Sequence, residues 1–327
     1  MENYNFLNRV LHSVSLNNKF VPEMTYNIEK SLFQPIDARS NVYITGLARA
    51  GTTTFLNGLH SSGEFASLTY LDMPFLLAPN LWAKLTSMSL KSSKPRERAH
   101  QDGVMVSAYS PEALEEVFWK LHCDYYADGK LNTHVVDDEV LEELQIYQGL
   151  ICRRYNKKRY LSKNNNMLLR IKSLSSRLQH TNFIILFREP HSHALSLLNQ
   201  HHKFLRSGKF TKKYMSYLSH HEFGETYKPF DFSIRGDNKH NPNLIEYWIE
   251  VWANTYSYAL SLAGRENIRF VCYEDLCTSD AYWSNICNFL EIKSDNPFKK
   301  NKKLAEVNIS DQRAHKIYEK LSLNAEF

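Results

Sequence analysis

Short runs of apolar residues alternate along the chain with longer segments in which apolar residues recur at helical spacing. The short runs predict buried strands, because they contain too few residues for a helix. These strands are expected at residues 42–45, from about 64 to 70–72, at 160–162, 183–187 and 268–276. Helices are expected from residue 52, at 110–123, 137–158 and 167–178, from 190, at 243–263, and around Trp283 and Ala314. The alternation predicts an α/β fold with a central, mainly parallel β-sheet flanked by helices.

The chain is expected to divide into an N-terminal extension and one larger domain. Residues 1–40 are polar and mixed, with apolar residues at helical spacing between 7 and 14, and are predicted as a helical extension. Residues 41–327 are predicted as a single α/β domain with helical insertions at about 74–158 and 207–241.

The stretch NVYITGLARAGTTTFLNGL, residues 41–59, has the most specific pattern in the chain. A buried strand leads into a turn bounded by Gly46 and Gly51, and a helix begins at Thr52. This order is typical of a phosphate-binding loop, in which backbone amides and the positive end of a helix dipole face an anion. Arg49 adds a cation inside the turn. The loop is therefore predicted to bind an anion rather than to serve only as a connector.

The same loop departs from the nucleoside triphosphatase pattern at one position. Thr52 stands where such proteins carry the lysine that spans the β and γ phosphates. The absence of this lysine argues against hydrolysis of ATP or GTP. The expected fold is a three-layer, P-loop-like one whose ligand is a different phosphorylated donor.

Charged residues follow three other predicted strands. Asp72 ends the second strand, Lys163 follows the third, and Arg188 follows the fourth, with Ser196 about two turns into the next helix. Ligands of an open parallel sheet bind at the carboxyl ends of its strands, so these residues are candidates for the same crevice as the loop. Arg188 offers a bidentate fork to a phosphate, and Ser196 a hydroxyl. An ordinary salt-bridged arginine explains this pattern equally well.

Composition narrows the class of protein and its partners. A formal charge of +5 over 327 residues suits an anionic ligand but not a dedicated nucleic-acid binder. The basic segment 91–103 is expected to be a solvated loop, with attraction of an anionic acceptor as the alternative. Five cysteines without CxxC or Cys/His spacing fit reduced thiols. Neither a membrane span nor a signal peptide is evident, so a cytoplasmic location is expected.

With these motifs in this order, the chain resembles the PAPS-dependent sulfotransferases, and in particular a bacterial member related to the Golgi and heparan-type carbohydrate enzymes. The resemblance spans about residues 41–290. In that family the first strand, loop and helix bind the 5′-phosphosulfate of 3′-phosphoadenylyl sulfate (PAPS). The segment GLARAGTT resembles this loop, with Arg49 at the position of the usual lysine and with Ala50, Gly51, Thr52 and Thr53 supplying amides and hydroxyls.

Two further motifs are similar to those of the family. An arginine at a strand end with a serine eight residues on binds the 3′-phosphate, and FREPHSHALS places Arg188 and Ser196 there. In heparan-type members a glutamate after the second strand is the general base and a lysine in a KTP-like motif contacts the site. Asp72 in YLDMP and Lys163 in LSKNNN hold similar positions, although aspartate is one methylene shorter and asparagines replace Thr-Pro.

The C-terminal motifs bear on the branch of the family. The segment CYEDL resembles the family's RYEDL strand and is expected to be structural. The GxxGxWK loop of cytosolic members is absent from the sequence, which favours the carbohydrate-type branch.

The resemblance implies transfer of a sulfuryl group from PAPS to a hydroxyl or amine of a carbohydrate or small hydroxylated acceptor. The product nucleotide is 3′,5′-ADP, no metal is required, and the implied catalytic residues are Asp72, Arg49 and Lys163. Two alternatives stay open, namely a P-loop kinase that uses ATP and magnesium, and a nucleotide- or glycan-binding module without activity.

Overall fold

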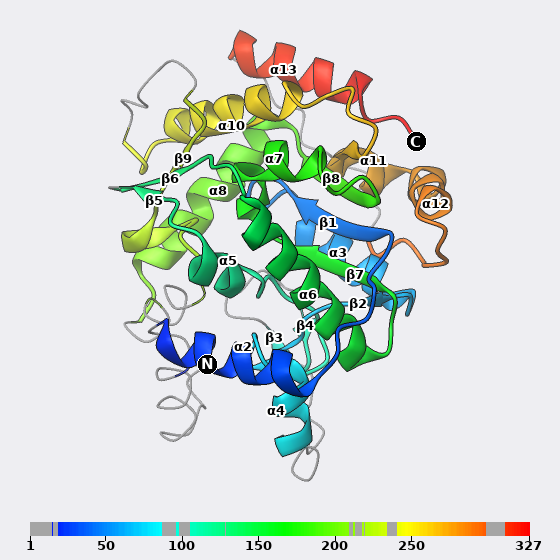
Figure 1. Cartoon of the computed structure of the whole chain (residues 1–327). Coiled ribbons are helices and arrows are strands. Elements are labelled where there is room, and N and C mark those ends of the chain that lie inside the picture. The colour runs from blue at the N-terminus through cyan, green and yellow to red at the C-terminus, as the bar shows by residue number, and fades with distance from the viewer. Residues whose placement is uncertain are drawn as a thin grey trace.

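The structure is a computed structural model of the chain (Figure 1). It describes residues 19–86, 105–127, 129–208, 220–233, 241–298 and 311–327, together with residues 15, 96–97, 212 and 218. The first half of the chain contains α2 (Phe20–Leu32), β1 (Asn41–Thr45), α3 (Thr52–Ser61), β2 (Phe65–Ala66), the 3₁₀ helix η1 (Tyr70–Asp72), α4 (Pro79–Thr86), β3 (Arg96–Glu97), β4 (Met105–Val106), α5 (Glu116–His122), β5 (Tyr126–Ala127), β6 (Lys130–Asn132) and α6 (Asp138–Tyr155).

The second half completes the central sheet and its helices. It contains β7 (Arg159–Lys163), the 3₁₀ helix η2 (Asn165–Leu169), α7 (Ile171–Ser175), β8 (Thr181–Phe187), α8 (Pro190–Leu205), the 3₁₀ helix η3 (Gly224–Thr226), β9 (Phe230–Asp231), α10 (Ile245–Leu260), β10 (Ile268–Cys272), α11 (Tyr273–Thr278), α12 (Asp280–Phe289) and α13 (Gln312–Leu323).

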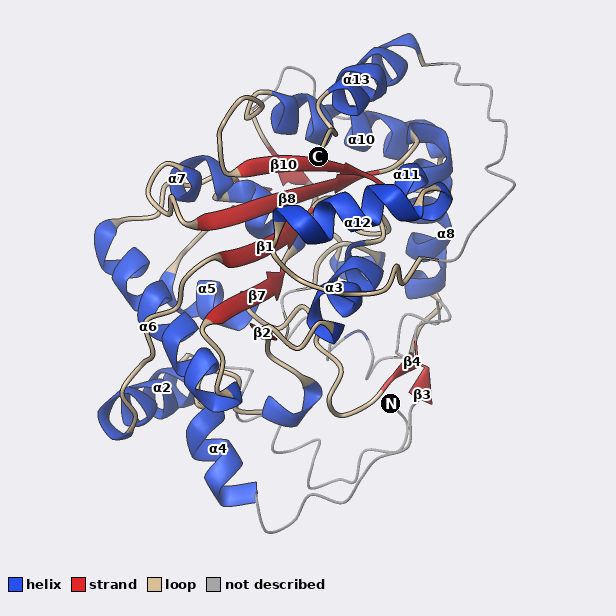
Figure 2. Ribbon diagram, turned by 90° about the vertical axis from the view of Figure 1, so that its right-hand side faces the viewer, coloured by secondary structure: helices blue, strands red, loops and turns tan. Residues whose placement is uncertain are grey.

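In the described part of the chain the central sheet has five strands in the order β10-β8-β1-β7-β2 (Figure 2). Every pair is parallel. Ile44 is paired with Lys163 on one side and with Ile184 on the other, while Cys272 is paired with Phe187. The strands β7, β1, β8 and β10 therefore end at one common edge. The predicted α/β fold with a mainly parallel central sheet is confirmed.

Helices cover both faces of this sheet. Val42 and Ile44 lie in one buried cluster with residues of α3 and α12. Tyr43 points to the other face, where its ring stacks on Phe183 at 5.5 Å and joins a larger cluster with α6 and α10. Figures 1 and 2 show these pairs of helices on opposite sides of the strands. Successive side chains of β1 thus point to opposite faces of the sheet, and helices cover both faces in the expected three layers. The loops that follow the strands lie at the carboxyl edge of the sheet.

Several element boundaries predicted from the sequence are wrong. The helix expected at 110–123 begins only at Glu116, because the Ser110 hydroxyl accepts a hydrogen bond from the amide of Ser107 and Pro111 forms a bridge to Thr69. The strand expected to reach 70–72 ends at Ala66. Its continuation becomes η1, where the Thr69 hydroxyl caps the first turn.

Two later boundaries also differ. The helix expected at 167–178 is divided into η2 and α7, because Arg170 leaves helical geometry and pairs with the buried Glu116 at 3.0 Å. The strand expected at 268–276 ends at Cys272, and α11 follows at once. The helices α6, α8, α10, α12 and α13 lie where the sequence predicts them.

Some predicted segments lie outside the described residues. This applies to the apolar face at 7–14, to most of the basic segment 91–103 and to much of the insertion at 207–241. Within the basic segment, Arg96–Glu97 pairs antiparallel with Met105–Val106. No helix within the described ranges is long and apolar enough to cross a membrane.

Candidate functional site

The loop between β1 and α3 depends on two glycines. Gly46 has φ 138°, and a Cβ built there would lie 2.4 Å from the carbonyl oxygen of Leu186 in β8. Gly51 has φ 90°, and a Cβ there would lie 2.7 Å from the ring of Tyr273. A side chain at either position would collide with its neighbour and strain the backbone. The loop is therefore packed tightly against the ends of β8 and β10.

Arg49 is at the centre of this loop and has a left-handed backbone, with φ 73°. Such a conformation costs roughly 1–3 kcal/mol for a residue other than glycine, so the surroundings must hold it. The helix α8 supplies two of these contacts. His193 Nε2 lies 2.8 Å from the carbonyl oxygen of Ala48, and Arg49 Nε donates to Ser196 Oγ at 3.3 Å. The predicted loop cation and the predicted serine are thus in direct contact.

The first turn of α3 has the features of an anion-binding end. No described side chain caps it, and it contains no acidic residue. In α8, by contrast, the Glu189 carboxylate accepts hydrogen bonds from the amides of His191 and Ser192. Thr52 and Thr53 in the first turn of α3 are both buried. The positive end of the helix therefore lies at the carboxyl edge of the sheet, next to the loop that carries Arg49, without a carboxylate in its own first turn.

Arg188 directly follows β8 and lies at the same edge of the sheet. Its Nε is 4.0 Å from Glu274 Oε1, and its guanidinium lies 4.8 Å from the centre of the Tyr273 ring. The Nε atom is buried and has no hydrogen-bond partner among the described residues. A buried guanidinium donor without a partner is costly unless a ligand supplies the acceptor.

Two side chains connect the loop with Arg188. The Tyr273 ring packs under Gly51 and also under the Arg188 guanidinium. His193 is buried between the two cations. The pKa of His193 is lowered to about 3, chiefly by burial, and the positive charges of Arg188 and Arg49 contribute to this lowering. The imidazole is therefore neutral near pH 7 and adds no third positive charge near the two arginines.

The sequence analysis did not assign Tyr273, Glu274 or His193 to the site. The first two lie in CYEDL, which was expected to be structural. The rule that found Arg188, a polar residue directly after a buried strand, also points to Tyr273 and Glu274, because they follow β10 at the same edge. His193 gave no comparable signal, since a histidine inside a helix is most often a packing residue.

Lys163 is the last residue of β7 and is paired with Ile44 of β1. It is 8% exposed, so the residue is largely buried. The neighbouring side chain, Asn164, donates to Glu116 at 2.6 Å. Lys163 therefore lies at the predicted edge, on the strand next to the one that leads into the loop.

Asp72 has a different location. It is the last residue of η1 and is 1% exposed, which is a correction to its expected place at a strand end. Its Oδ2 accepts from the amide of Thr69 at 2.8 Å and from the Tyr155 hydroxyl, and Arg154 Nε lies 3.7 Å from Oδ1. None of these partners belongs to residues 46–53. Burial raises the pKa of Asp72 despite these contacts.

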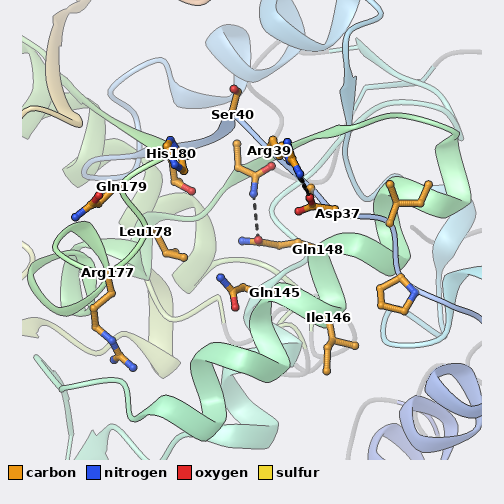
Figure 3. Close-up of a pocket in the computed structure, with 15 residues that line it drawn as sticks. Asp37, Arg39, Ser40, Gln145, Ile146, Gln148, Arg177, Leu178, Gln179 and His180 are labelled. Atoms are coloured by element: carbon orange, nitrogen blue, oxygen red, sulfur yellow. Dashed lines mark hydrogen bonds and ion pairs between the residues drawn. The ribbon is translucent and has the colours of Figure 1, made fainter.

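A cavity of about 840 Å³ lies at the opposite edge of the sheet (Figure 3). Figure 3 shows Gln145 and Gln148 of α6 in its wall, with Arg39 turned toward Asp37. Two of its polar side chains are paired: Asn41 donates to Gln148 at 3.1 Å, and Gln148 donates to the Tyr43 hydroxyl at 2.9 Å. The cavity adjoins the amino ends of β1 and β8, so it is separate from the edge where parallel sheets bind ligands.

Comparison with known proteins gives similarity of fold at low sequence identity. No protein-family model matches the chain, and no curated protein sequence matches it. Among solved structures, it is similar to the sulfotransferase STF1 from Mycobacterium tuberculosis H37Rv, at 12% identity over 94% of this chain and 84% of that chain, with a TM-score of 0.45. The sulfotransferase STF9 from Mycobacterium avium matches at 12% identity over 99% and 79%, with a TM-score of 0.43.

A third match is the sulfotransferase domain from the curacin biosynthetic pathway, at 15% identity over 90% of this chain and 99% of that chain, with a TM-score of 0.41. At these identities and TM-scores, function has to be argued from the residues of this chain. Within its described part, no group of three or more His, Cys, Asp or Glu side chains is arranged to hold a metal ion.

Proposed function

We propose that the protein transfers a sulfuryl group from PAPS to a hydroxyl or amine of an acceptor and releases 3′,5′-ADP. The observation that carries this proposal is the placement of two arginines at one edge of the sheet. Arg49 contacts Ser196 at 3.3 Å, and Arg188 has a buried Nε without a hydrogen-bond partner among the described residues. PAPS carries two separate anionic groups, a 5′-phosphosulfate and a 3′-phosphate, and each would meet one of these cations.

The loop is proposed to bind the 5′-phosphosulfate. During transfer the acceptor atom forms a bond to sulfur, the bond from sulfur to the bridging oxygen breaks, and the electron pair stays on the 5′-phosphate. Such an in-line displacement requires mainly positioning and neutralisation of the leaving charge. Arg49, the amides of Gly51 to Thr53 and the dipole of α3 would meet that charge. Loss of one such donor costs about 3 kcal/mol, or roughly a hundredfold in rate. The amide of Ala50, which the sequence pattern includes among the donors, already donates to the Leu47 carbonyl at 3.3 Å.

Arg188 and Ser196 are proposed to bind the 3′-phosphate, and Lys163 to add positive charge at the edge of the sheet. Arg188 is held from one side by Glu274 and from below by Tyr273, so its fork needs little reorganisation to accept a phosphate. The register of β7 against β1 places Lys163 beside the strand that enters the loop.

Asp72 is proposed as the general base on the strength of the sequence resemblance. Two observations support this role: burial raises the pKa of Asp72, and its Oδ1 has no hydrogen-bond partner among the described residues. A base for a hydroxyl acceptor is most effective when its pKa approaches the operating pH. Because Asp72 contacts Thr69 and Tyr155, which lie outside the loop, its role as general base has to be tested with the Asp72→Asn variant.

The proposal is tested by thermal stabilisation with 3′,5′-ADP and by transfer of ³⁵S from labelled PAPS to a panel of acceptors. Arg49→Ala should reduce transfer by roughly a hundredfold, whereas Arg39→Ala, which removes an exposed arginine paired with Asp37, should leave transfer unchanged. Absence of stabilisation by 3′,5′-ADP would reject the nucleotide site. Turnover of ATP that strictly requires magnesium would favour the kinase, and stabilisation without transfer would favour an inactive module.

A further inference from the structure

The segment that follows α12, residues 294–298, is fixed to two helices near the loop. The Ser294 hydroxyl donates to the carbonyl of Gly58 in α3 at 2.6 Å. The Asn296 side-chain amide donates to the carbonyl of Leu276 in α11 at 3.0 Å. The segment therefore joins the helix that follows the loop to the helix that carries Tyr273.

The last residue of this segment, Phe298, is 7% exposed. Its amide donates to Asn296 Oδ1 at 3.0 Å, and its ring centre lies 6.3 Å from that of Trp283. Pro297, the residue before it, packs on α3 so closely that a Cβ at Gly58 would lie 2.6 Å from the proline ring. The position of the Phe298 ring is thus fixed by packing as well as by hydrogen bonds.

The Phe298 ring contacts both the loop and Tyr273. A Cβ at Gly51 would lie 3.2 Å from a ring carbon of Phe298. The Phe298 and Tyr273 rings are T-shaped, with centres 5.8 Å apart and an interplanar angle of 78°. The Arg188 guanidinium lies over the Tyr273 ring at 4.8 Å. Phe298, Tyr273 and Arg188 therefore form a row of contacts that ends at the residue proposed to bind the 3′-phosphate.

We propose that Phe298 is a positioning residue for the nucleotide: it holds the Tyr273 ring, and this ring holds the Arg188 guanidinium ready for the 3′-phosphate. The inference rests on the proposed function. A guanidinium is attracted to the face of an aromatic ring, and an arginine that is ordered in advance loses less entropy on binding. Without Phe298 the Tyr273 ring has room to tilt, and the nucleotide has to order Arg188 itself.

The first measurement needs no nucleotide. The Nε–Hε resonance of Arg188, assigned by its loss in Arg188→Ala, is shifted by the ring current of Tyr273, because the guanidinium lies over that ring. In Phe298→Ala the resonance should move toward its position in Tyr273→Leu. An unmoved resonance in a folded Phe298→Ala would overturn the inference.

Phe289→Ala is the matched control for this measurement. Phe289 in α12 also has a T-shaped aromatic partner, Phe327, at 5.6 Å, and the Arg269 guanidinium lies over its ring at 5.0 Å. The same kind of contact is therefore removed away from the loop, and the Arg188 resonance should stay in place.

The second measurement is calorimetric titration with 3′,5′-ADP and with 5′-AMP. Because Phe298 also contacts the loop, Phe298→Ala should weaken the binding of both nucleotides, and the ratio of the two affinities isolates the 3′-phosphate. This ratio should fall about fivefold, as expected when one side chain has to be immobilised on binding. It should stay unchanged in Phe289→Ala. In Tyr273→Leu, the added Phe298→Ala should cause no further fall, because Phe298 acts through Tyr273.

A folded Phe298→Ala with the wild-type ratio, or a second fall of equal size in Tyr273→Leu, would show that Phe298 is only a core residue. If Phe298→Ala does not fold, Phe298→Leu fills most of the space without the aromatic edge, and the same outcomes decide. Absence of 3′,5′-ADP binding in the wild type rejects the proposed function, whereas the Arg188 resonance still tests the row of contacts.

Discussion

Replacement of Arg188 by alanine tests the donor site most directly, because its effect is expected to depend on one phosphate group. A bidentate contact between a guanidinium and a phosphate consists of two charge-assisted hydrogen bonds of about 1.5–3 kcal/mol each. The Arg188 side chain is 25% exposed, so the lower end applies, and the loss is about 3 kcal/mol. This corresponds to a decrease of roughly 150-fold in affinity for 3′,5′-ADP.

The assay is calorimetric titration with 3′,5′-ADP and with 5′-AMP, which lacks the 3′-phosphate. The wild type should prefer 3′,5′-ADP strongly. Arg188→Ala should bind the two nucleotides with nearly equal affinity, because the group that distinguishes them has lost its partner. Arg39→Ala, with the same change in net charge at the opposite edge of the sheet, should keep the wild-type preference.

Folding has to be monitored in the same experiment. Glu274 would lose its cation in Arg188→Ala, but it keeps contacts with the Glu189 amide and with the Tyr318 hydroxyl. The loss in the free energy of unfolding should therefore be about 1 kcal/mol. If Arg188→Ala folds and still prefers 3′,5′-ADP as strongly as the wild type does, the assignment of the 3′-phosphate to this arginine is refuted.

Three further predictions concern the loop and its support. Gly46→Ala should destabilise the fold by more than about 2 kcal/mol and abolish binding of 3′,5′-ADP, because its Cβ would lie 2.4 Å from a carbonyl oxygen. Gly63→Ala, also at positive φ but in open space, is the control in urea unfolding and should cost only about 1 kcal/mol. Arg49→Lys keeps the charge but has no Nε to donate to Ser196, so kcat should fall at least tenfold; unchanged kcat would mean that charge alone suffices. The pKa of His193 in the folded protein is about 3, against 6.5 for an ordinary histidine. Between about pH 3 and pH 6.5 the imidazole is therefore protonated in the unfolded chain but not in the folded one. The free energy of unfolding accordingly decreases as the pH falls below 6.5. In urea unfolding between pH 7.5 and 5, His193→Gln should lose up to about 1.4 kcal/mol less per pH unit than the wild type; identical slopes would show that folding does not lower the pKa of His193.

The sequence predicts the elements whose signals are local. FIILFREP contains an uninterrupted apolar run, an arginine and a proline at the first helical position, and β8, Arg188 and α8 follow in that order. The glycines of the loop are equally local, since their spacing alone indicates the tight turn. These signals place Arg49 and Arg188 at one edge because parallel strands share a direction.

Long-range partners explain the errors. Ser110 and Pro111 are a good local start for a helix, yet Pro111 forms a bridge to Thr69, about forty residues away in the sequence. Likewise Asp72 has a capping-box arrangement with Thr69, and its other contacts come from the end of α6. The partners in these pairs are too far apart in the sequence to fall within one stretch of helical or strand periodicity. The ends of elements that lie beside buried carboxylates are therefore the hardest to predict from the sequence.

The substitution of arginine for lysine in the loop has a structural consequence beyond charge. A guanidinium carries five N–H donors in a fixed plane, whereas an ammonium group is a single point of charge. Through its Nε, Arg49 contacts Ser196 on α8, the helix that also supplies His193 to the loop. A lysine at this position has no donor partway along its side chain, so it cannot hold Ser196 and extend its terminal group toward a phosphate at once. The arginine therefore joins the two motifs proposed to bind phosphate, through one contact between the loop and α8, and this contact is one of those that hold the left-handed residue at the centre of the loop.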